Sequence, residues 1–395
     1  MFSKFPVTRL RAFFFPPPID GPSQARRVAF DSLRGVLALL LVLLHMGQQR
    51  IAVIPQNFTH QRQLSVGIFF TISGFFVAYS LLKKPEFDRP GFIRSRCRRI
   101  LPAYFACLLV SIGMVSADVI IGDPPGEALG NLLSHLTLTH AWFDGHSGTI
   151  LPPLWTLSHE WAFYGFILAT AGMLRGPRWW WPLVAIMITA PLCRLGVYRE
   201  WIDLPNDLRH PLCIMDFFAP GIAAGVLCQR EGTRRLWEQA RFQGILLVVG
   251  LGLAGWAIFA HHSVSFALPN GDLPGLKFYF AFEKEFLSSQ TNLLFYQTAL
   301  ATGSACLILW LWHRPATIAR LCRRTPLPWM GKVSYSTYLW HMPIIYCYAR
   351  AMKRSPSEFF AASPWPLFLT VLGLIYLHSA FAWRLFEKPF LNPKS

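Results

Sequence analysis

Charged residues are scarce in this sequence. Asp, Glu, Lys and Arg make up only 14% of its 395 residues, whereas hydrophobic residues make up 53% and aromatic residues 15%. About a quarter of the residues in a typical soluble domain are charged, so this composition excludes an ordinary soluble enzyme. The eight cysteines include no close pair, which indicates neither a disulfide framework nor a zinc site.

Familiar catalytic and targeting signals are missing as well. The sequence has no GxSxG, no P-loop and no HExxH, so nothing supports a soluble-type hydrolase, a nucleotide hydrolase or a zinc protease. Prolines at Pro16 to Pro18 follow the apolar run Phe13 to Phe15 at once and deny it the length of a signal-peptide core. We therefore expect residues 1–28 to form a retained, basic cytoplasmic tail.

Long apolar runs fill the rest of the chain. A transmembrane helix needs about 20 apolar residues, and ten runs come near that length. The sequence thus predicts an all-α fold, a polytopic bundle of about ten transmembrane helices over 29–390, with a C-terminal tail at 391–395. Prolines and Asp216 make a broken or re-entrant helix possible in the fifth and sixth runs. The runs are 29–47, 64–82, 100–120, 154–174, 179–195, 209–228, 243–261, 292–312, 333–350 and 364–385.

Basic residues are distributed unevenly between the loops. With a cytoplasmic N-terminus, the inside segments hold 26 Lys and Arg and the outside segments hold 10. The positive-inside rule explains this bias in an inner-membrane protein and predicts that both termini are cytoplasmic. It also explains the net charge of +17 with no nucleic acid as a partner. The two longest outside segments, 121–150 and 262–291, are candidate acceptor-contacting loops.

The first span carries two ionisable residues. Arg34 and His45 are eleven positions apart, which places them on one helix face, separated by roughly 16 Å along the axis. Such side chains are costly toward lipid, so this face is expected to line a protein interior or an aqueous cavity. The alternative is that Arg34 pairs with Asp31 at the membrane boundary and that His45 is an interfacial residue.

The fourth span carries a carboxylate. Glu160 and Tyr164 share a helix face at i, i+4, and the helical rise places Glu160 at a depth similar to that of His45. A carboxylate that orients an imidazole makes it a better base, so the two are a candidate acid–base unit. Alternatively, Glu160 satisfies a helix end or a Trp N–H. Trp155 and Ser158 precede it as candidate cavity-lining residues.

The loop before the third span is the most basic part of the chain. Residues 83–99 hold seven Lys and Arg, including Arg96 and Arg99. Arginines can clamp phosphates through bidentate hydrogen bonds, but composition alone favours an anchor to anionic lipid headgroups.

Two other spans add small and titratable residues. In the second span, Ser73 and Gly74 allow another helix to approach closely, and tight packing is the favoured role of the glycine. In the ninth, His341 precedes Pro343, which frees a carbonyl because it lacks an N–H. His341 either lines the same cavity or hydrogen-bonds to another span.

Five sequence blocks occur in an order typical of one family. Over residues 27–390 the chain resembles the acyltransferase-3 family of integral-membrane acyltransferases, which move an acyl group, commonly acetyl, from acyl-CoA to a hydroxyl of a glycan or related acceptor. The blocks are FDSLRG with Arg34-x10-His45, FFTISGF, Arg96-x2-Arg99-Ile-Leu-Pro, LWTLSHEWAFY, and SYSTYLWHMP with a closing Glu387-Lys388-Pro389.

The resemblance implies roles for individual residues. Arg34 and His45 would be essential, and Arg96 and Arg99 would handle a cytoplasmic acyl-CoA, with acetyl-CoA expected as a co-substrate and no bound cofactor or metal. His45, oriented by Glu160, would then remove the proton of an acceptor hydroxyl that enters from outside.

Alternatives and departures accompany this interpretation. The pantetheine arm of acyl-CoA would enter the bundle past Arg34 and Ser73, and direct transfer competes with a covalent intermediate on His45 or Ser73. A proton-coupled transporter or flippase also suits intramembrane His, Glu and Arg, and a structural scaffold is a third class. Gly67-Ile68 stand where the family often has an acidic residue, and His159 stands where an aliphatic residue usually precedes the glutamate.

Overall fold

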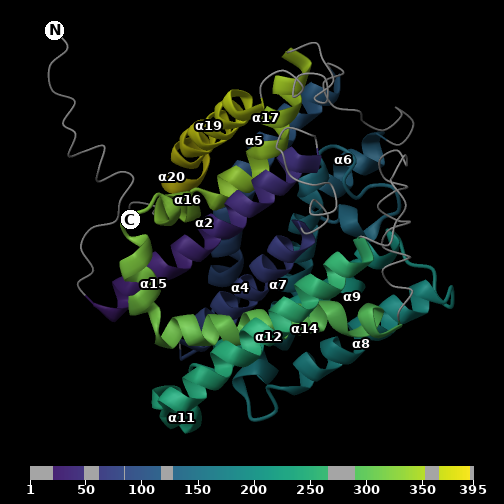
Figure 1. Cartoon of the computed structure of the whole chain (residues 1–395). Coiled ribbons are helices and arrows are strands. Elements are labelled where there is room, and N and C mark those ends of the chain that lie inside the picture. The colour runs from purple at the N-terminus through teal and green to yellow at the C-terminus, as the bar shows by residue number, and fades with distance from the viewer. Residues whose placement is uncertain are drawn as a thin grey trace, which may run out of the picture. The chain divides into compact units, whose positions relative to one another are not determined.

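The computed structural model describes residues 21–48, 62–83, 85–116, 128–265, 290–351 and 364–391. Every regular element in these ranges is a helix (Figure 1), which confirms the all-α class. Each of the ten expected apolar runs coincides with a helix or, for the sixth, with a broken helix. In chain order these helices are α2 (Pro22–Gln48), α4 (Arg62–Lys83), α5 (Arg89–Ser116), α7 (Trp155–Arg175), α8 (Trp181–Tyr198), α9 (Pro211–Ile214) with η5 (Met215–Phe217) and α10 (Ala219–Leu227), α12 (Ala240–Ser265), α14 (Gln290–His313), α17 (Ser334–Ala351), and α19 (Pro364–Ala382).

Shorter helices lie between these long ones, and the apolar runs did not predict them. They include α6 (Ala128–Leu136), η2 (His140–Trp142), α11 (Arg234–Glu238), α15 (Pro315–Cys322), α16 (Leu327–Lys332), the π-helical turn η7 (Trp383–Glu387) and α20 (Lys388–Leu391).

Five helical segments in the described ranges are long and apolar enough to cross a membrane: those of α2, α4, α5 and α12, and Pro366–Leu391. The count becomes six if Pro211–Leu227 and Glu231–Glu238, which are bent by 87° to each other, form one span. The protein is therefore polytopic. Ten crossings, and the cytoplasmic location of both termini, stay predictions.

Two helices begin earlier than expected. Helix α2 starts at Pro22, so the tail expected over 1–28 ends in helix; residues 1–20 lie outside the described ranges. Helix α5 starts at Arg89, so the segment expected as a loop over 83–99 is helical in its second half. The reason is local: Asp88 Oδ1 accepts a hydrogen bond from the Gly91 N–H at 2.9 Å, which caps the helix, and arginine is a good helix former.

The chain divides into two compact units, the first from residues 1–54, 94–110 and 310–395. In this unit α15, α16 and α17 pack along α2, and α19 packs on α17. Helices α2 and α16 meet backbone to backbone: a Cβ on Gly35 would lie 2.2 Å from the Leu327 carbonyl oxygen, and one on Gly331 would lie 1.6 Å from that of Asp31. Only glycine fits at these two positions.

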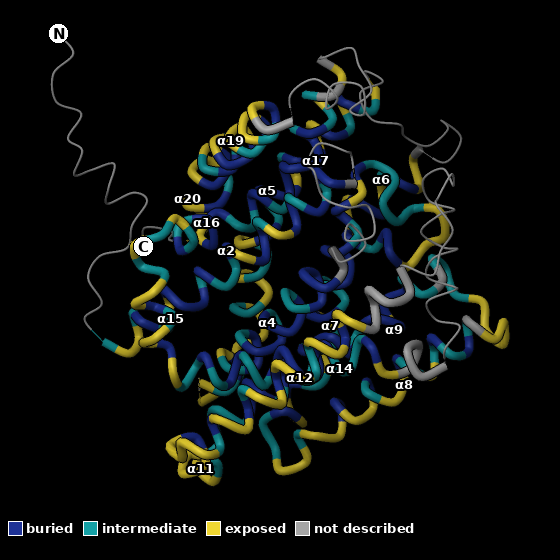
Figure 2. Tube along the Cα trace, viewed as in Figure 1, coloured by how far each residue is buried: buried dark blue, intermediate teal, exposed yellow. Residues whose placement is uncertain are grey.

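The second unit comprises residues 55–93 and 111–309. Helices α4 and α10 pack closely, because Gly74 and Gly221 have no Cβ at their contact. An added Cβ would lie 2.5 Å from the Phe218 carbonyl oxygen at Gly74 and 2.0 Å from the Thr71 carbonyl oxygen at Gly221. This confirms the packing role predicted for Gly74. The same unit contains α12, which is exposed along much of its length (Figure 2). Its exposed residues include large apolar ones such as Val248, as expected of a helix that faces lipid.

Candidate active site

His45 has a defined tautomer in the first unit. Its Nδ1 lies 2.9 Å from the carbonyl oxygen of Leu41, one turn earlier in α2. A carbonyl only accepts hydrogen bonds, so Nδ1 carries the proton, and the Nε2 of the neutral ring carries the lone pair. The imidazole is half-buried. His45 is therefore suited to accept a proton at Nε2.

His341 packs against this ring. The two ring centroids are 4.8 Å apart and the ring planes are inclined by 56°. His341 is fully buried, and its Nδ1 binds the Tyr338 carbonyl oxygen at 2.8 Å. Its Nε2 has no hydrogen-bond partner among the residues that the structure describes. The structure thus joins two imidazoles, from α2 and α17, in one polar cluster.

Pro343 has the backbone effect that its lack of an N–H predicts. The carbonyl of Leu339, four residues earlier in α17, accepts a hydrogen bond from the Cys107 thiol at 3.3 Å. A residue of α5 thereby satisfies the carbonyl that the proline leaves without an intrahelical donor. This contact fixes α17 beside α5, two residues before His341.

Arg34 lies near the middle of α2, three turns before His45. Its Nη1 is 3.8 Å from Asp31 Oδ1, and Arg27 Nε is 3.8 Å from Asp31 Oδ2. These are long, partly solvated ion pairs, as in the boundary arrangement that the sequence left open. Three helical turns, about 16 Å of rise, separate Arg34 from His45, so any effect of Arg34 on the imidazole is indirect.

Glu160 belongs to a second cluster, in the second unit. Its Oε1 accepts hydrogen bonds from the Tyr164 hydroxyl at 2.6 Å and from the Ser73 hydroxyl at 2.9 Å. The i, i+4 relation predicted for Glu160 and Tyr164 is confirmed, and Ser73 joins them from α4. His45 is in the other unit, so its pairing with Glu160 stays a prediction.

The residues before Glu160 hold the adjoining turn. The Ser158 hydroxyl accepts a hydrogen bond from the Ala141 N–H at 3.2 Å, which ties η2 to α7. The two ring nitrogens of His159, the departure noted in the sequence, lie 2.8 Å from the Trp155 carbonyl oxygen and 2.7 Å from the Arg209 carbonyl oxygen. The Trp155 ring meets that of His159 edge to face, with centroids 5.0 Å apart. Cavity-lining roles for Trp155 and Ser158 stay predictions.

Arg96 and Arg99 are one turn apart on α5, so the helix presents them on one face. Arg96 is half-buried and Arg99 is exposed. Arg99 interacts electrostatically with the carboxylates of Asp31 and Glu387. The pair therefore lies on a helix that is fastened to the first unit, which is a more defined position than the loop expected from the sequence.

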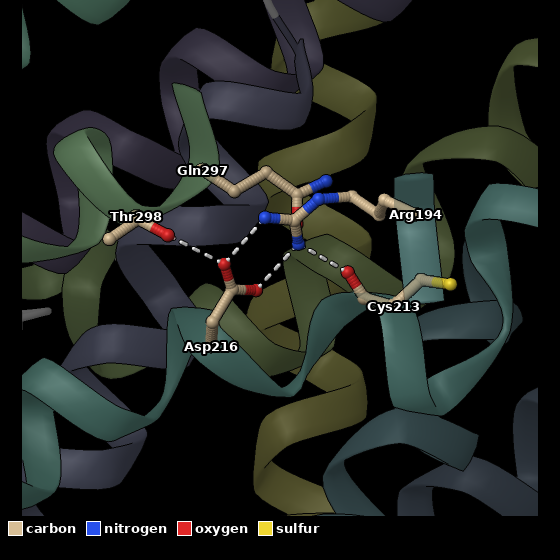
Figure 3. A network of polar contacts seen from close by, with 5 residues as sticks. All are labelled: Arg194, Cys213, Asp216, Gln297 and Thr298. Carbon is tan, nitrogen blue, oxygen red and sulfur yellow. Dashed lines mark hydrogen bonds and ion pairs between the residues drawn. The ribbon is translucent and has the colours of Figure 1, made fainter. Parts of the chain in front are cut away.

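A buried ion pair in the second unit was not predicted. The guanidinium of Arg194 on α8 donates to both carboxylate oxygens of Asp216, at 3.0 and 2.9 Å, and both side chains are almost completely buried. The same guanidinium satisfies the Cys213 carbonyl at the break between α9 and η5. Gln297 and Thr298 of α14 close the network (Figure 3). Arg194, although charged, is thus a core residue of the second unit.

Two histidines stack in the segment after α5. The rings of His135 and His140 are nearly parallel, with centroids 4.1 Å apart. Burial lowers the pKa of His135 to about 4 and that of His140 to about 3, because removal from water penalises the charged ring. No group of three His, Cys, Asp or Glu in the described ranges is arranged to hold a metal ion.

Comparison with known proteins places these features in one family. Residues 27–384 match the family described as an acyltransferase domain. A putative membrane-bound transacylase, BcsY of Komagataeibacter xylinus, is 27% identical over 355 residues, which cover 85% of this chain and 75% of that protein. The exopolysaccharide production protein ExoZ of Rhizobium meliloti (strain 1021) is 27% identical over 83% of this chain and 89% of its own length.

Longer relatives match over part of their length. A putative peptidoglycan O-acetyltransferase, YrhL of Bacillus subtilis (strain 168), is 23% identical over 80% of this chain but only 48% of its own length. No solved structure is significantly similar to the chain.

Proposed function

The chain belongs to the acyltransferase-3 family of membrane acyltransferases, and from this premise we propose that it moves an acetyl group from cytoplasmic acetyl-CoA to a hydroxyl of a glycan at the inner membrane. As a family member it is a multi-pass membrane acyltransferase. The names of its relatives, a transacylase, an exopolysaccharide production protein and a peptidoglycan O-acetyltransferase, support a polysaccharide or glycan-like acceptor.

The tautomer of His45 is the observation that carries the proposal. Because Leu41 holds the Nδ1 proton, Nε2 is the basic nitrogen and takes the proton of the acceptor hydroxyl. The oxygen attacks the thioester carbonyl, the new C–O bond forms, and the C–S bond breaks. The proton on Nε2 then returns to the leaving thiolate, which gives CoA thiol and an ester. His341 covers one face of the ring and restricts its orientation.

Arg96 and Arg99 are proposed to bind the phosphates of acyl-CoA. Two arginines on successive turns of one helix can each direct several N–H groups at the same anion. Arg34 would follow on α2, along the route of the acyl chain toward His45.

Ser73 gives the proposal a second chemical route. Its hydroxyl donates to Glu160 at 2.9 Å, and a carboxylate in that position can accept the proton when the oxygen attacks. This contact favours Ser73 over His45 as the carrier in a two-step transfer through an acyl-enzyme. Acid quenching of enzyme mixed with labelled acetyl-CoA, without acceptor, tests this route: label retained by wild type and absent from Ser73→Ala would support it.

Release of CoA thiol by the purified protein tests the proposed function. We expect thiol release from acetyl-CoA that depends on added glycan and is lost in His45→Ala. The control is His378→Ala, which should keep the activity; His378 is on α19 and its ring packs against Trp340 of α17. Absence of thiol release from wild type with every glycan tried, together with proton-driven glycan transport in vesicles, would establish the transporter instead.

A further inference from the structure

Glu387 is a buried carboxylate to which neither the sequence motifs nor the proposed reaction assigns a role. Its side chain is only 5% exposed, although glutamate is almost never buried without partners. It ends the π-helical turn η7 that follows α19. A π-turn holds one more residue than an α-turn, and such turns are frequent at functional sites. The extra residue changes the direction in which Glu387 leaves the helix.

The partner of Glu387 is the start of α17. Ser336 donates both its hydroxyl and its backbone N–H to the carboxylate. The first backbone N–H groups of a helix lack intrahelical acceptors and carry partial positive charge, so a carboxylate there is stabilised. Glu387 thus caps the helix that carries His341 five residues further on.

The start of α17 is also tied to the arginine helix, α5. The residue before Ser336, Tyr335, donates its hydroxyl to the Ile100 carbonyl oxygen at 3.0 Å. This bond places the backbone of Arg99, the neighbour of Ile100 in the chain, near the start of α17. Arg99 also interacts electrostatically with Glu387. Both helices and η7 belong to the first unit.

Other cations surround this point and leave positive charge in excess. Lys332 Nζ lies 4.5 Å and Lys388 Nζ lies 5.9 Å from the centroid of the Trp383 ring, which begins η7. Burial and the nearby cations Arg27 and Lys388 lower the pKa of Lys332, and the Asp31 carboxylate opposes this shift. The cations still outnumber the two carboxylates, Glu387 and Asp31, and this charge balance suits a site that receives an anion.

We propose that Glu387 is a positioning residue of the donor site, which holds the first turn of α17 and, through the Tyr335–Ile100 hydrogen bond, the turn of α5 that carries Arg99 in the arrangement that acyl-CoA needs. This rests on the proposed function, in which Arg96 and Arg99 bind CoA phosphates. A guanidinium has five donors, and a fixed backbone at Arg99 lets several of them reach one phosphate.

The kinetics of Glu387→Gln separate this role from a purely structural one. We expect the KM for acetyl-CoA to rise about tenfold with kcat within about threefold of wild type, since the variant loses donor binding and not chemistry. The exposed Glu238→Gln, which has an i, i+4 pair with Arg234 on α11, is the matched control and should leave both constants unchanged.

A double-mutant cycle with Arg99 supplies the decisive readout. If Glu387 acts through Arg99, Glu387→Gln adds little to the KM of Arg99→Ala, whereas independent effects multiply. Multiplication of the two effects, or an unchanged KM in Glu387→Gln, overturns the proposal. Should Glu387→Gln fail to fold, Ser336→Ala keeps the carboxylate but removes its hydroxyl donor. That variant should raise the KM about threefold, and an unchanged value would again overturn the proposal.

Calorimetric titration of wild type, Arg99→Ala and Glu387→Gln with CoA separates failure of the proposed function from failure of the role of Glu387. If wild type neither binds CoA nor releases thiol, the proposed function fails. If it does both, and Arg99→Ala weakens CoA binding while Glu387→Gln does not, the function stands and only the role of Glu387 fails.

Discussion

The imidazole of His341 packs against that of His45, with ring centroids 4.8 Å apart. Both rings donate Nδ1–H to a carbonyl of their own helix, so both direct their basic nitrogen away from the backbone. The contact gives the first unit a pair of packed imidazoles, of which His45 is half-buried and His341 is fully buried.

His45→Ala should abolish acyl transfer while abundance in the membrane stays near that of wild type. A positioned general base contributes about 10² to 10⁴ in rate, and alanine does not hinder the insertion of this leucine-rich helix. Thiol release by equal amounts of purified variant and wild type measures the effect. More than about a tenth of wild-type activity would remove His45 from the central role.

His341→Phe should lower kcat by about tenfold to about a hundredfold and change the KM for acetyl-CoA little. Phenylalanine keeps a ring against His45 but removes the hydrogen bond from His341 Nδ1 to the Tyr338 carbonyl oxygen. The ring at position 341 then shifts and displaces His45, and displacement of a catalytic group by about 1 Å can cost ~10² in rate. Steady-state kinetics separate the two constants. An unchanged kcat would make His341 a packing residue only.

The helices were largely predictable from the sequence, because a run of about 20 apolar residues has few other stable conformations in a membrane. The short α16 was not, since six residues around Gly331 form a helix only because α2 lies against them. The π-turn that directs Glu387 inward is likewise invisible in an apolar pattern. A broken or re-entrant helix was possible in both the fifth and the sixth runs; the sixth is broken, whereas the fifth, α8, is one continuous helix that contains Pro191.

The candidate site was predictable in part. Helix periodicity correctly joined Glu160 to Tyr164, whereas the contacts Ser73 to Glu160 and His341 to His45 depend on tertiary packing between helices distant in sequence. One missed contact had a usable signal. Arg194 and Asp216 are opposite charges in consecutive apolar runs, and intramembrane charges usually pair.

Arg96→Ala and Arg99→Ala should raise the KM for acetyl-CoA and leave the KM for the acceptor unchanged. Lysine at either position should recover only part of the loss, because an ammonium group cannot make the planar bidentate contact of a guanidinium. Arg98→Ala, next to Arg99 on another face of α5, is the matched control. Equal KM values for acetyl-CoA in the double-alanine, double-lysine and wild-type proteins would restore the lipid-anchor interpretation.

Acid should destabilise the segment that contains His135 and His140. Their pKa values in the folded protein are about 4 and about 3, below the ordinary 6.5, so the unfolded segment binds protons that the folded one does not. Stability is complete above about pH 6.5 and falls as the pH drops toward 4 and then 3. Hydrogen exchange of residues 131–149 at pH 7.5 and pH 5 measures this. Exchange corrected for intrinsic rate that stays constant, or that has the same pH dependence in the double variant His135→Leu/His140→Leu, would contradict it.

The Arg194–Asp216 pair should behave as a buried unit when it is disrupted. Asp216→Leu leaves a buried guanidinium without its counter-ion, and loss of one partner of such a pair typically costs about 3 to 5 kcal/mol. Arg194→Met likewise leaves the buried Asp216 carboxylate without its counter-ion. The double variant Arg194→Met/Asp216→Leu should unfold at a temperature closer to wild type than either single variant, because no isolated charge remains.

Arg234→Ala, which breaks an exposed pair with Glu238, is the control and should cost no more than about 1 kcal/mol. Thermal unfolding of the purified proteins compares all four. Strictly additive losses in the double variant would mean that the two side chains contribute independently, and that the network seen around the broken helix does not hold it together.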